Sequence, residues 1–410
     1  MKLACRFCGT ALRHTFANLG MSPLANSYLR EDQLEAMEPF YSLHVRVCSE
    51  CLLVQLPEFE SPEHIFSDYA YFSSFSDSWL KHCEAYAMQM TARFGLGSDA
   101  LVAEVASNDG YLLQYFARAG VPILGIEPAA NVAKVAMDKG VPTEVAFFGA
   151  KTAERLAGQG RRANLIAANN VLAHVPDIND FVRGLSILLK PEGVVTIEFP
   201  HLLNLIEQNQ FDTIYHEHFS YFSFGVVERI CARHGLRVFD VDRIPTHGGS
   251  LRIYACLEGA QGHAQTERVA GLRALEKAAG LDKLEGHTRV QDRLAALKCD
   301  VMSFFASARR EGRLVAGYGA PAKGNTLLNF CGIGPELMPF TVDRSPHKQS
   351  LYLPGTHIPI RDPGEIGRAK PDYVFILPWN LKDEIMEQMK HVRGWGGRFV
   401  APIPEVRVLP

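Results

Sequence analysis

The sequence of 410 residues lacks the marks of several common classes of protein. No stretch approaches the ~18 uninterrupted apolar residues of a membrane-spanning helix, and the start, MKLACRFCGTAL, lacks the apolar core of a signal peptide. The formal net charge is −3 and there is no long basic run, which argues against binding a nucleic-acid backbone. We therefore expect a cytoplasmic protein that binds neither membranes nor nucleic acids. Its oligomeric state is not evident, and a monomer is compatible with the sequence.

Cysteine is sparse, but four of the nine cysteines stand in two Cys-x-x-Cys pairs: Cys5 with Cys8, and Cys48 with Cys51. Two such pairs can complete a tetrahedral site that suits zinc, and four thiolates leave no open position for water, which indicates a structural role. The alternatives are two disulfides or a redox dithiol, but a thioredoxin-like site would use one pair near a βαβ unit. The other five cysteines are scattered, as expected of reduced thiols.

The middle of the chain alternates short apolar strands with helix-like runs. The strands are expected at Leu101–Val105, in PILGIEP, in ANLIAANNVLAHV and at Gly193–Pro200. This alternation predicts a parallel sheet with helices on both faces. Ligands of such sheets bind beyond the carboxyl ends of the strands, which are here the ASNDG turn, Glu127 and the AANNVLAHV stretch.

The glycine fingerprint of dinucleotide-binding proteins is missing from this unit. Only Gly110 stands in the turn where that fingerprint has Gly-x-Gly-x-x-Gly. A nucleoside without phosphates demands less, and Glu127 is placed to accept hydrogen bonds from both ribose hydroxyls. Glu104 could reach the backbone of the turn or a cationic ligand. A Rossmann-type sheet with incidental acidic residues is the alternative.

The stretch FDTIYHEHFSYFS, residues 211–223, places two histidines and a glutamate between aromatic residues. It allows a metal site, a general base or an ordinary core segment. His216, Glu217 and His218 are adjacent, so in a strand they would point to alternating faces, which disfavours a shared ion. Histidine has an unperturbed pKa of ~6.5 and suits a general base. The segment HGGSLR, residues 247–252, follows another short strand and could return to the same cleft.

The rear of the chain repeats the strand, glycine turn and helix pattern in RLVAGYGAPAKGNTLLNF. Backbone amides at this helix start, with Lys323, would favour an anion such as a diphosphate. Asp343 follows the next strand, with Arg344 and Lys348 nearby, and PDYVFILPWN adds a buried strand that ends near Trp379. These features favour nucleotide-sugar binding, and a purely structural repeat of the sheet fold is the alternative.

The order of elements resembles a class I S-adenosylmethionine-dependent methyltransferase. EVASNDG, GIEP and NNVLAHVPD are similar to that family's glycine turn, ribose carboxylate and segment after the fourth strand. The Cys-x-x-Cys pairs, SNDG, YHEHFSYFS, HGGSLR, GYGAPAKGNTLLNFCGIG and DRSPHKQSLYLPGTHIPI extend the resemblance over essentially the whole chain. Together they resemble the nucleotide-sugar C-methyltransferases, such as the sugar C-3′-methyltransferase of tetronitrose biosynthesis.

The resemblance implies a role for each matching residue. It makes His218 the base, with Glu217, Tyr215, Tyr71 and His247 in the catalytic site. The residues expected to bind S-adenosylmethionine are Tyr71, Glu104, Ser107, Asn108, Gly110, Glu127, Pro128, Asn169, Asn170 and His174. Those expected to bind the nucleotide sugar are His174, Tyr215, Gly248, Arg252, Tyr318, Gly319, Lys323, Asp343, Arg344, Lys348 and Trp379. Zinc would be held by the four paired cysteines.

The expected fold is α/β in three units. Residues 1–75 form a zinc-binding module, 76–257 a class I methyltransferase Rossmann-like domain, and 258–410 a helical connector with a second Rossmann-like domain. The expected reaction is methyl transfer from S-adenosylmethionine to a ring carbon, C-3′, of a dTDP-linked 4-keto-deoxysugar through an enolate. The alternatives are a nucleotide-sugar dehydrogenase or reductase, a C-methyltransferase of a non-sugar substrate, and a zinc-ribbon interaction protein that has lost catalysis. The missing Gly-x-Gly-x-x-Gly and Tyr-x-x-x-Lys patterns argue against the dehydrogenase.

Overall fold

The computed structural model describes residues 3–60, 74 and 77–410, so Tyr71 lies outside the described residues. The N-terminal module is an antiparallel sheet in the order β1-β2-β3-β9. It contains β1 (His14–Ser22), β2 (Tyr41–Val47), β3 (Val54–Gln55) and β9 (Ser220–Tyr221). The sequence YSLHVRV of β2 alternates apolar and polar residues, which places Leu43, Val45 and Val47 on a buried face. The fourth strand comes from a distant part of the chain.

The first α/β unit carries a seven-stranded sheet in the order β10-β11-β8-β7-β4-β5-β6. Its strands are β4 (Val102–Val105), β5 (Ile123–Ile126), β6 (Thr143–Glu144), β7 (Ala163–Asn169), β8 (Leu189–Pro200), β10 (Leu236–Ile244) and β11 (Ser250–Leu257). Its helices are α2 (Asp77–Phe94), α3 (Leu113–Arg118), α4 (Ala130–Asp138), α5 (Ala150–Gly158), α6 (Ile178–Leu188), α7 (Leu202–Glu207) and α8 (Phe224–Arg233). The predicted alternation is confirmed. The five strands from β8 to β6 in this order are parallel, whereas β11 runs antiparallel between β8 and β10.

The second α/β unit carries a six-stranded sheet in the order β14-β13-β12-β15-β16-β17, parallel except for β17. Its strands are β12 (Val315–Tyr318), β13 (Thr341–Val342), β14 (Ile360–Arg361), β15 (Tyr373–Ile376), β16 (Arg398–Ala401) and β17 (Arg407–Leu409). Its helices are α11 (Ala322–Cys331), α12 (Gly364–Ala369) and α13 (Lys382–Gln388), and α9 (Glu267–Ala278) and α10 (Val290–Arg310) precede it.

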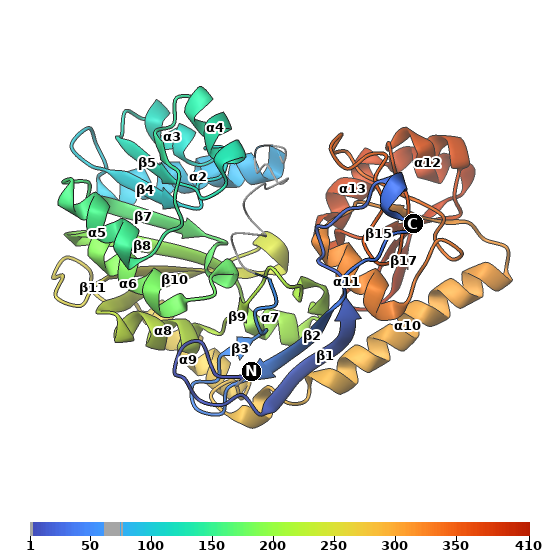
Figure 1. Cartoon of the computed structure of the whole chain (residues 1–410), viewed down its shortest axis with the longest axis horizontal. Coiled ribbons are helices and arrows are strands. Elements are labelled where there is room, and N and C mark those ends of the chain that lie inside the picture. Colours follow the sequence, from blue (N-terminus) through green and yellow to red (C-terminus); the bar gives the residue numbers. More distant parts are fainter. Residues whose placement is uncertain (1–2, 61–73, 75–76) are drawn as a thin grey trace.

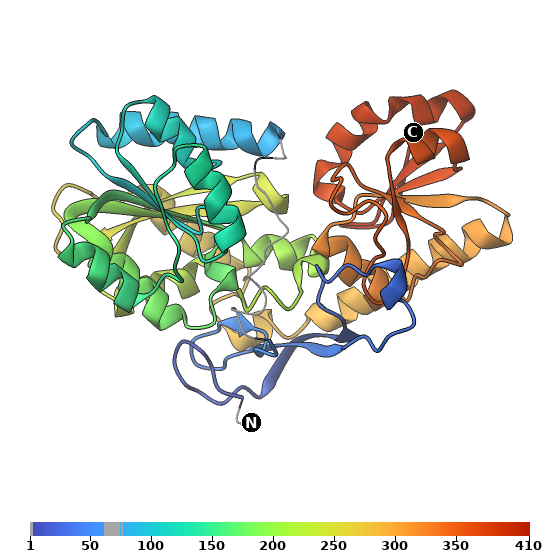
Figure 2. The ribbon, with the colours of Figure 1, turned by 45° about the horizontal axis from the view of Figure 1, so that its top comes forward.

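The N-terminal module lies across the two α/β units, which stand side by side (Figures 1 and 2). Cys48 and Cys51 belong to the same buried cluster as the first sheet. Strands β1 and β2 instead share a buried cluster with α10, α11 and the second sheet. One small module therefore packs into both cores and fixes how the two units meet. Among the described residues, no helix has the length and apolar character needed to cross a membrane.

Candidate active site

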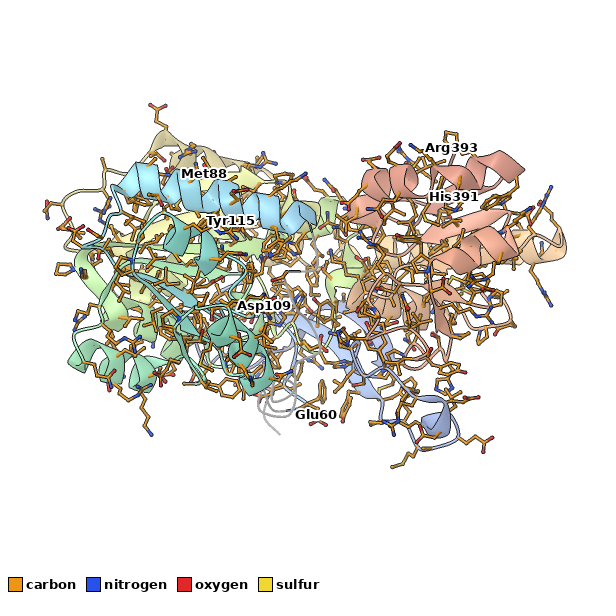
Figure 3. The ribbon with its side chains drawn as sticks, turned by 90° about the horizontal axis from the view of Figure 1, so that it is seen from above. Glu60, Met88, Asp109, Tyr115, His391 and Arg393 are labelled. Atoms are coloured by element: carbon orange, nitrogen blue, oxygen red, sulfur yellow. The ribbon has the colours of Figure 1, made fainter. Side chains whose placement is uncertain are left out.

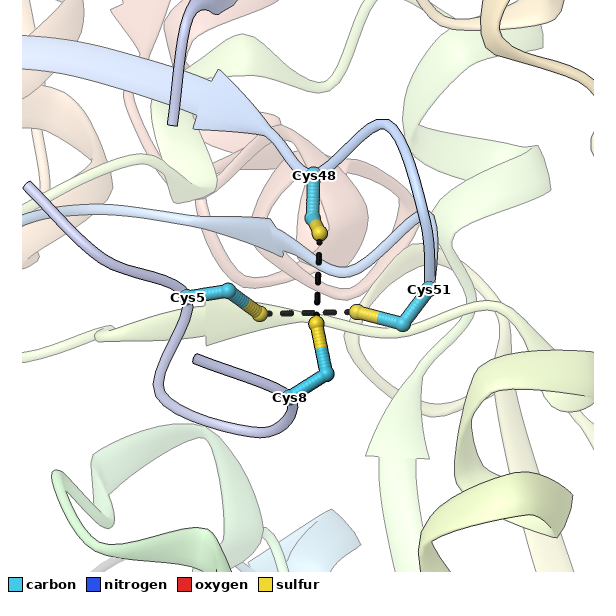
Figure 4. Close-up of side chains that lie close together, drawn as sticks. All are labelled: Cys5, Cys8, Cys48 and Cys51. Atoms are coloured by element: carbon cyan, nitrogen blue, oxygen red, sulfur yellow. Dashed lines mark hydrogen bonds between the residues drawn. The ribbon is translucent and has the colours of Figure 1, made fainter. Parts of the chain in front are cut away.

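The four paired cysteines come together at one end of the N-terminal module (Figure 4). Their sulfur atoms lie within 4.8 Å of one another, with Cys5 Sγ 3.4 Å from Cys51 Sγ and Cys8 Sγ 3.5 Å from Cys48 Sγ. Four sulfurs bonded to zinc at ~2.3 Å would stand about 3.8 Å apart, close to these distances. All nine cysteines are free thiols, so the alternative of two disulfides is not formed. The arrangement fits a structural zinc site with four cysteine ligands.

The carboxyl ends of β4, β5 and β7 gather buried polar groups around the turn at residues 106–110. Ala106 and Asn108 adopt φ of 57° and 46°, beside Gly110 at 77°. Ser107 and Asn169 are buried, and within the described part of the chain their Oγ and Oδ1 atoms have no hydrogen-bond partner. Buried polar groups are normally satisfied, so these atoms fit a bound ligand that presents donors here. The side-chain Oδ1 and Nδ2 atoms of Asn170, which follows β7, also have no hydrogen-bond partner among the described residues.

Two glutamates flank this turn and differ in their partners. Glu127, which follows β5, accepts hydrogen bonds from the backbone N–H of Asn108 and of Ala129, each at 2.9 Å, and the second bond closes a tight turn over Pro128. Burial raises the pKa of Glu127 despite these bonds. Burial also raises the pKa of Glu104 well above its usual value. Asp109 lies on the side of the first unit that faces the second (Figure 3) and pairs with Lys139 at 3.0 Å.

The stretch Tyr215–His218 is a turn, and β9 begins only at Ser220. Its histidine and glutamate side chains nevertheless point to different neighbours. The His216 ring packs edge-on against Tyr41 and Phe59 of the N-terminal module, with centroids 5.7 and 6.0 Å away. Glu217 is buried and its Oε2 accepts a hydrogen bond from Asn26 Nδ2 at 2.8 Å. Burial raises the pKa of Glu217 to about 7.

His218 is held through both ring nitrogens. Nδ1 lies 2.8 Å from the carbonyl oxygen of Thr213, and Nε2 lies 2.8 Å from the Tyr215 hydroxyl. A carbonyl only accepts, so Nδ1 carries the proton and the lone pair belongs to Nε2. The His174 ring stands 4.7 Å away, edge-on, and its Nδ1 contacts the Glu217 carbonyl at 2.8 Å. Burial lowers the pKa of His218 well below its usual value, and the His174 ring lowers it further.

His247 and Gly248 close the site from the β10–β11 connection. His247 has a φ of 57°, and burial lowers its pKa to about 4. Its carbonyl accepts a hydrogen bond from Lys323 Nζ at 3.4 Å, and Lys323 Nζ lies 5.3 Å from the centre of the Trp379 ring. Gly248 has a φ of 89°, and a Cβ there would stand 2.7 Å from the Trp379 ring. The corner therefore needs glycine so that Trp379 can approach.

Arg252 does not join the residues around His218. It is buried, and its Nε donates to Glu198 Oε1 at 2.6 Å. Glu198 also contacts His82 Nε2 at 3.1 Å, and the His82 ring stacks on Trp79, 4.9 Å between centroids. The Trp79 ring in turn meets the His247 ring at 5.4 Å. Among the described residues, Arg252 is thus linked to His247 indirectly, through the side chains of Glu198, His82 and Trp79.

The other predicted substrate ligands lie at the carboxyl end of β12 and β13. Asp343 accepts hydrogen bonds from Ala320 N–H at 2.7 Å and Ser345 N–H at 2.8 Å, so it holds the turn that contains Gly319. Lys348 Nζ donates to the carbonyl of Ala320 at 2.8 Å. Arg344 is exposed. The Tyr318 hydroxyl turns away to Gln388 Oε1, 3.3 Å distant. A hollow of about 490 Å³ near Arg93 and His263 contains none of the predicted site residues.

Asp212, Asn26 and Tyr28 belong to this region but were not predicted from the sequence. Asp212 is buried and its Oδ2 accepts a hydrogen bond from Trp379 Nε1 at 2.6 Å, across the boundary between the two units. Asn26 and Tyr28 reach in from the N-terminal module, and the Tyr28 hydroxyl donates to the Ala320 carbonyl at 2.5 Å. These contacts join positions far apart in sequence. For Asp212 alone the sequence offered a local signal, because it is an acidic residue three positions before Tyr215.

Three family models match successive parts of the chain. They are described as "Putative zinc binding domain" over residues 5–66, "Methyltransferase domain" over residues 79–241 and "C-methyltransferase C-terminal domain" over residues 245–404. C-methyltransferase NovU of Streptomyces niveus is 37% identical over 405 residues, 99% of this chain and 96% of that protein.

Other similarities are shorter or weaker. Ubiquinone biosynthesis O-methyltransferase of a Chelativorans species is 30% identical over 97 residues, 23% of this chain and 38% of that protein. The solved structure of 1,6-didemethyltoxoflavin-N1-methyltransferase of Burkholderia thailandensis covers 50% of this chain and 94% of its own chain. It is 17% identical with a TM-score of 0.36, a value that supports no conclusion about this chain.

The fold, the four-cysteine module and these matches define an S-adenosylmethionine-dependent C-methyltransferase with an N-terminal zinc module and a C-terminal α/β unit. The predicted α/β fold class, enzyme class and cofactors are thereby confirmed, and the dehydrogenase alternative is set aside. The chain belongs to the family of C-methyltransferases that includes NovU of Streptomyces niveus.

Proposed function

We propose that this enzyme methylates a ring carbon, C-3′, of a dTDP-linked 4-keto-deoxysugar, with His218 as the base that forms the enolate. The observation that carries the proposal is the setting of His218, a half-buried imidazole whose Nδ1 faces the Thr213 carbonyl and whose Nε2 lone pair is directed at the Tyr215 hydroxyl. A carbon becomes nucleophilic only when it loses a proton, and the proton beside a ketone is the one that a weak base can remove. A 4-keto sugar provides such a carbon.

The residues around His218 support this role. The Thr213 carbonyl fixes the tautomer by accepting from Nδ1, which leaves Nε2 free of its own proton. Tyr215 donates to Nε2, so its hydroxyl either moves when substrate binds or passes the proton between substrate and base. Glu217, with its pKa raised to about 7, is held by Asn26 at the turn and can exchange a proton near neutral pH. Glu217 is buried, and Tyr215 and His218 are half-buried, which would limit the access of water to the enolate.

The methyl donor fits the carboxyl ends of β4, β5 and β7. Glu127 would accept from the ribose hydroxyls, and the unpartnered atoms of Ser107, Asn169 and Asn170 would contact other polar groups of the donor. When bound, S-adenosylmethionine supplies an electrophilic methyl group on a sulfonium. The chain orients that group and keeps water away from it. We also propose that the methyl donor is bound by Glu104, Asn108, Gly110, Pro128 and Tyr71.

The nucleotide part of the substrate belongs, in this proposal, to the second α/β unit. Gly319, Asp343, Arg344 and Lys348 collect at the carboxyl ends of β12 and β13, where ligands of parallel sheets bind. The division of the chain at residues 75 and 257 into zinc, methyltransferase and nucleotide-sugar units is part of the same proposal. Tyr318, at the end of β12, would act there through Gln388, whereas Arg252, on β11 of the first unit, would act on the substrate through Glu198 and His82.

The test is mass spectrometry of a panel of nucleotide-linked 4-keto-deoxysugars incubated with enzyme and S-adenosylmethionine. We expect a mass gain of one methyl group on at least one dTDP-linked 4-keto sugar and none on the parent sugars that lack the keto group. Methylation of the parent sugars at the same rate would contradict enolate chemistry. Methylation of a non-sugar carbon acid alone would replace the proposed substrate class.

A further inference from the structure

The first turn of α11 carries a cation from the second α/β unit into the region of the predicted base. Lys323 and Thr326 are three residues apart and therefore share a face of the helix. Thr326 Oγ1 donates to the Ile214 carbonyl at 2.9 Å, which fixes that face against the segment that ends in His218. The Phe211 and Phe330 rings, 5.1 Å apart, pack the same helix against the same segment. Lys323 is thus held at the boundary of the two units.

The surroundings of Lys323 combine an aromatic ring, a backbone carbonyl and the charge of a buried carboxyl group. Its Nζ lies over the Trp379 ring and 3.4 Å from the His247 carbonyl. Asp212, whose charge raises the pKa of Lys323, accepts a hydrogen bond from Trp379 Nε1 at 2.6 Å. The phosphate-type features predicted from sequence, Arg344 and Lys348, instead gather at the turn after β13. The His247 carbonyl takes one of the three N–H donors of the ammonium group, which leaves Nζ able to donate to a further acceptor such as a substrate oxygen.

We propose that Lys323 is a catalytic residue that binds the keto oxygen of the substrate and takes up the negative charge that develops there when His218 removes the adjacent proton. The inference rests on the proposed function, because it needs a ketone beside the methylated carbon. It assigns the base and the oxyanion-binding group to different α/β units. The reacting site is then complete only when both units are in place.

The electron balance of the step is simple. The C–H bond beside the ketone breaks, the proton goes to His218 Nε2, and the electron pair forms a carbon–carbon double bond while the carbonyl π pair moves to oxygen. The oxygen, now negative, accepts a hydrogen bond from Lys323 Nζ. In the second step the electron pair of the carbon–carbon double bond would form the new bond to the methyl carbon, and the S–CH3 bond would break with its pair left on sulfur, so that the donor leaves as a neutral thioether. The extra pair on oxygen then re-forms the carbonyl π bond.

The electrostatics of the cluster agree with this geometry. The charge on Lys323 contributes to lowering the pKa of both His218 and His247. The cation therefore acts electrostatically on the proposed base and on the β10–β11 connection. Burial lowers the pKa of Lys323, which Asp212 partly offsets. A desolvated ammonium in a water-poor site stabilises a developing oxyanion far more than it would in water.

The test compares Lys323→Met with Lys323→Arg and with Lys298→Met in the full-length enzyme. Lys298 of α10 lies over the Phe330 ring, so its variant controls for the loss of a lysine that packs on an aromatic ring near the same helix. The readouts are exchange of the proton beside the ketone with deuterated water in the absence of methyl donor, methyl transfer at saturation, and the Kd of the 4-keto nucleotide sugar by calorimetry.

We expect Lys323→Met to lose about 10²–10³-fold in both exchange and methyl transfer, as for other oxyanion donors, with a Kd within about threefold of the wild type. Lys323→Arg should retain part of both rates, and Lys298→Met all of them. A Lys323→Met enzyme that keeps its exchange rate but binds the sugar weakly would make Lys323 a phosphate ligand and overturn the inference. Thermal unfolding gives the fraction of the variant that is folded. If the rates of Lys323→Met fall only in proportion to that fraction, the role of Lys323 is structural and the inference is overturned. If the wild type neither exchanges nor methylates any 4-keto nucleotide sugar, the proposed function itself fails, and that outcome is read from the wild type alone.

Discussion

At the scale of single residues, the YHEH stretch shows that neighbouring side chains can have unrelated roles. His218 presents an Nε2 lone pair beside Tyr215, whereas His216 packs against rings of the N-terminal module. We predict that His218→Asn lowers turnover by about 10²–10⁴, the usual contribution of a positioned base, while both ligands still bind. Deuterium exchange beside the ketone should fall in parallel, and His216→Asn is the matched control. Near-normal turnover in His218→Asn, with loss in His247→Asn or Tyr215→Phe, would mean that the base is misassigned.

Glu127 is the second residue whose role can be isolated. Its carboxylate already accepts two backbone hydrogen bonds, so removing it takes away the proposed ribose acceptor and also frees two amides of the turn. We predict that Glu127→Ala weakens S-adenosylmethionine binding by about ten- to a hundredfold, or roughly 1.5–3 kcal/mol, with calorimetry as the measurement. Glu127→Gln keeps an acceptor oxygen and should be milder. A lower melting temperature with unchanged affinity would show that Glu127 only supports the turn.

At the scale of elements, the zinc module and the base are linked through two short strands. Cys51 is followed by β3, which pairs with β9, and β9 begins two residues after His218. Because metal binding and local folding are coupled, we predict that Cys48→Ser loses the zinc ion and loosens β3 and β9 together. Hydrogen exchange followed by mass spectrometry should show faster exchange in both strands. Cys299→Ser, at an exposed cysteine outside the site, should change neither zinc content, by elemental analysis, nor exchange. Faster exchange in β3 with β9 unchanged would contradict the link.

At the scale of the whole molecule, the sequence predicted the units but not how they meet. The strand and helix pattern and the Cys-x-x-Cys pairs are local signals, and the structure confirms them. The pairing of β9 with β3, and the contacts of Trp379 with Asp212 and of Asn26 with Glu217, join positions more than 150 residues apart. No local pattern encodes such contacts. The adjacent side chains of the YHEH stretch do point to different neighbours, but they do so from a turn, in which His216 packs on the N-terminal module.

The seating of the N-terminal module on the first α/β unit should make folding sensitive to acid at His216. This ring is buried against Tyr41 and Phe59, and burial lowers its pKa to about 4. The unfolded chain takes up a proton near pH 6.5 and the folded chain only near pH 4, so the stability that the neutral ring allows is lost as the pH falls between these values. The raised pKa values of buried carboxyl groups such as Glu217 act in the opposite direction. The pH dependence of the free energy of unfolding of the wild type therefore does not by itself give the contribution of His216.

Comparison with His216→Gln isolates it, because glutamine cannot be protonated and has a similar reach. We predict that the free energy of unfolding of the variant, relative to the wild type, rises by up to about 3 kcal/mol between pH 7 and pH 4. Urea unfolding at several pH values measures this difference, and His391→Gln, on the outside of the second unit (Figure 3), is the control. A difference that stays constant with pH would mean that His216 is protonated equally in the folded and unfolded chains, and that the module is seated by packing alone.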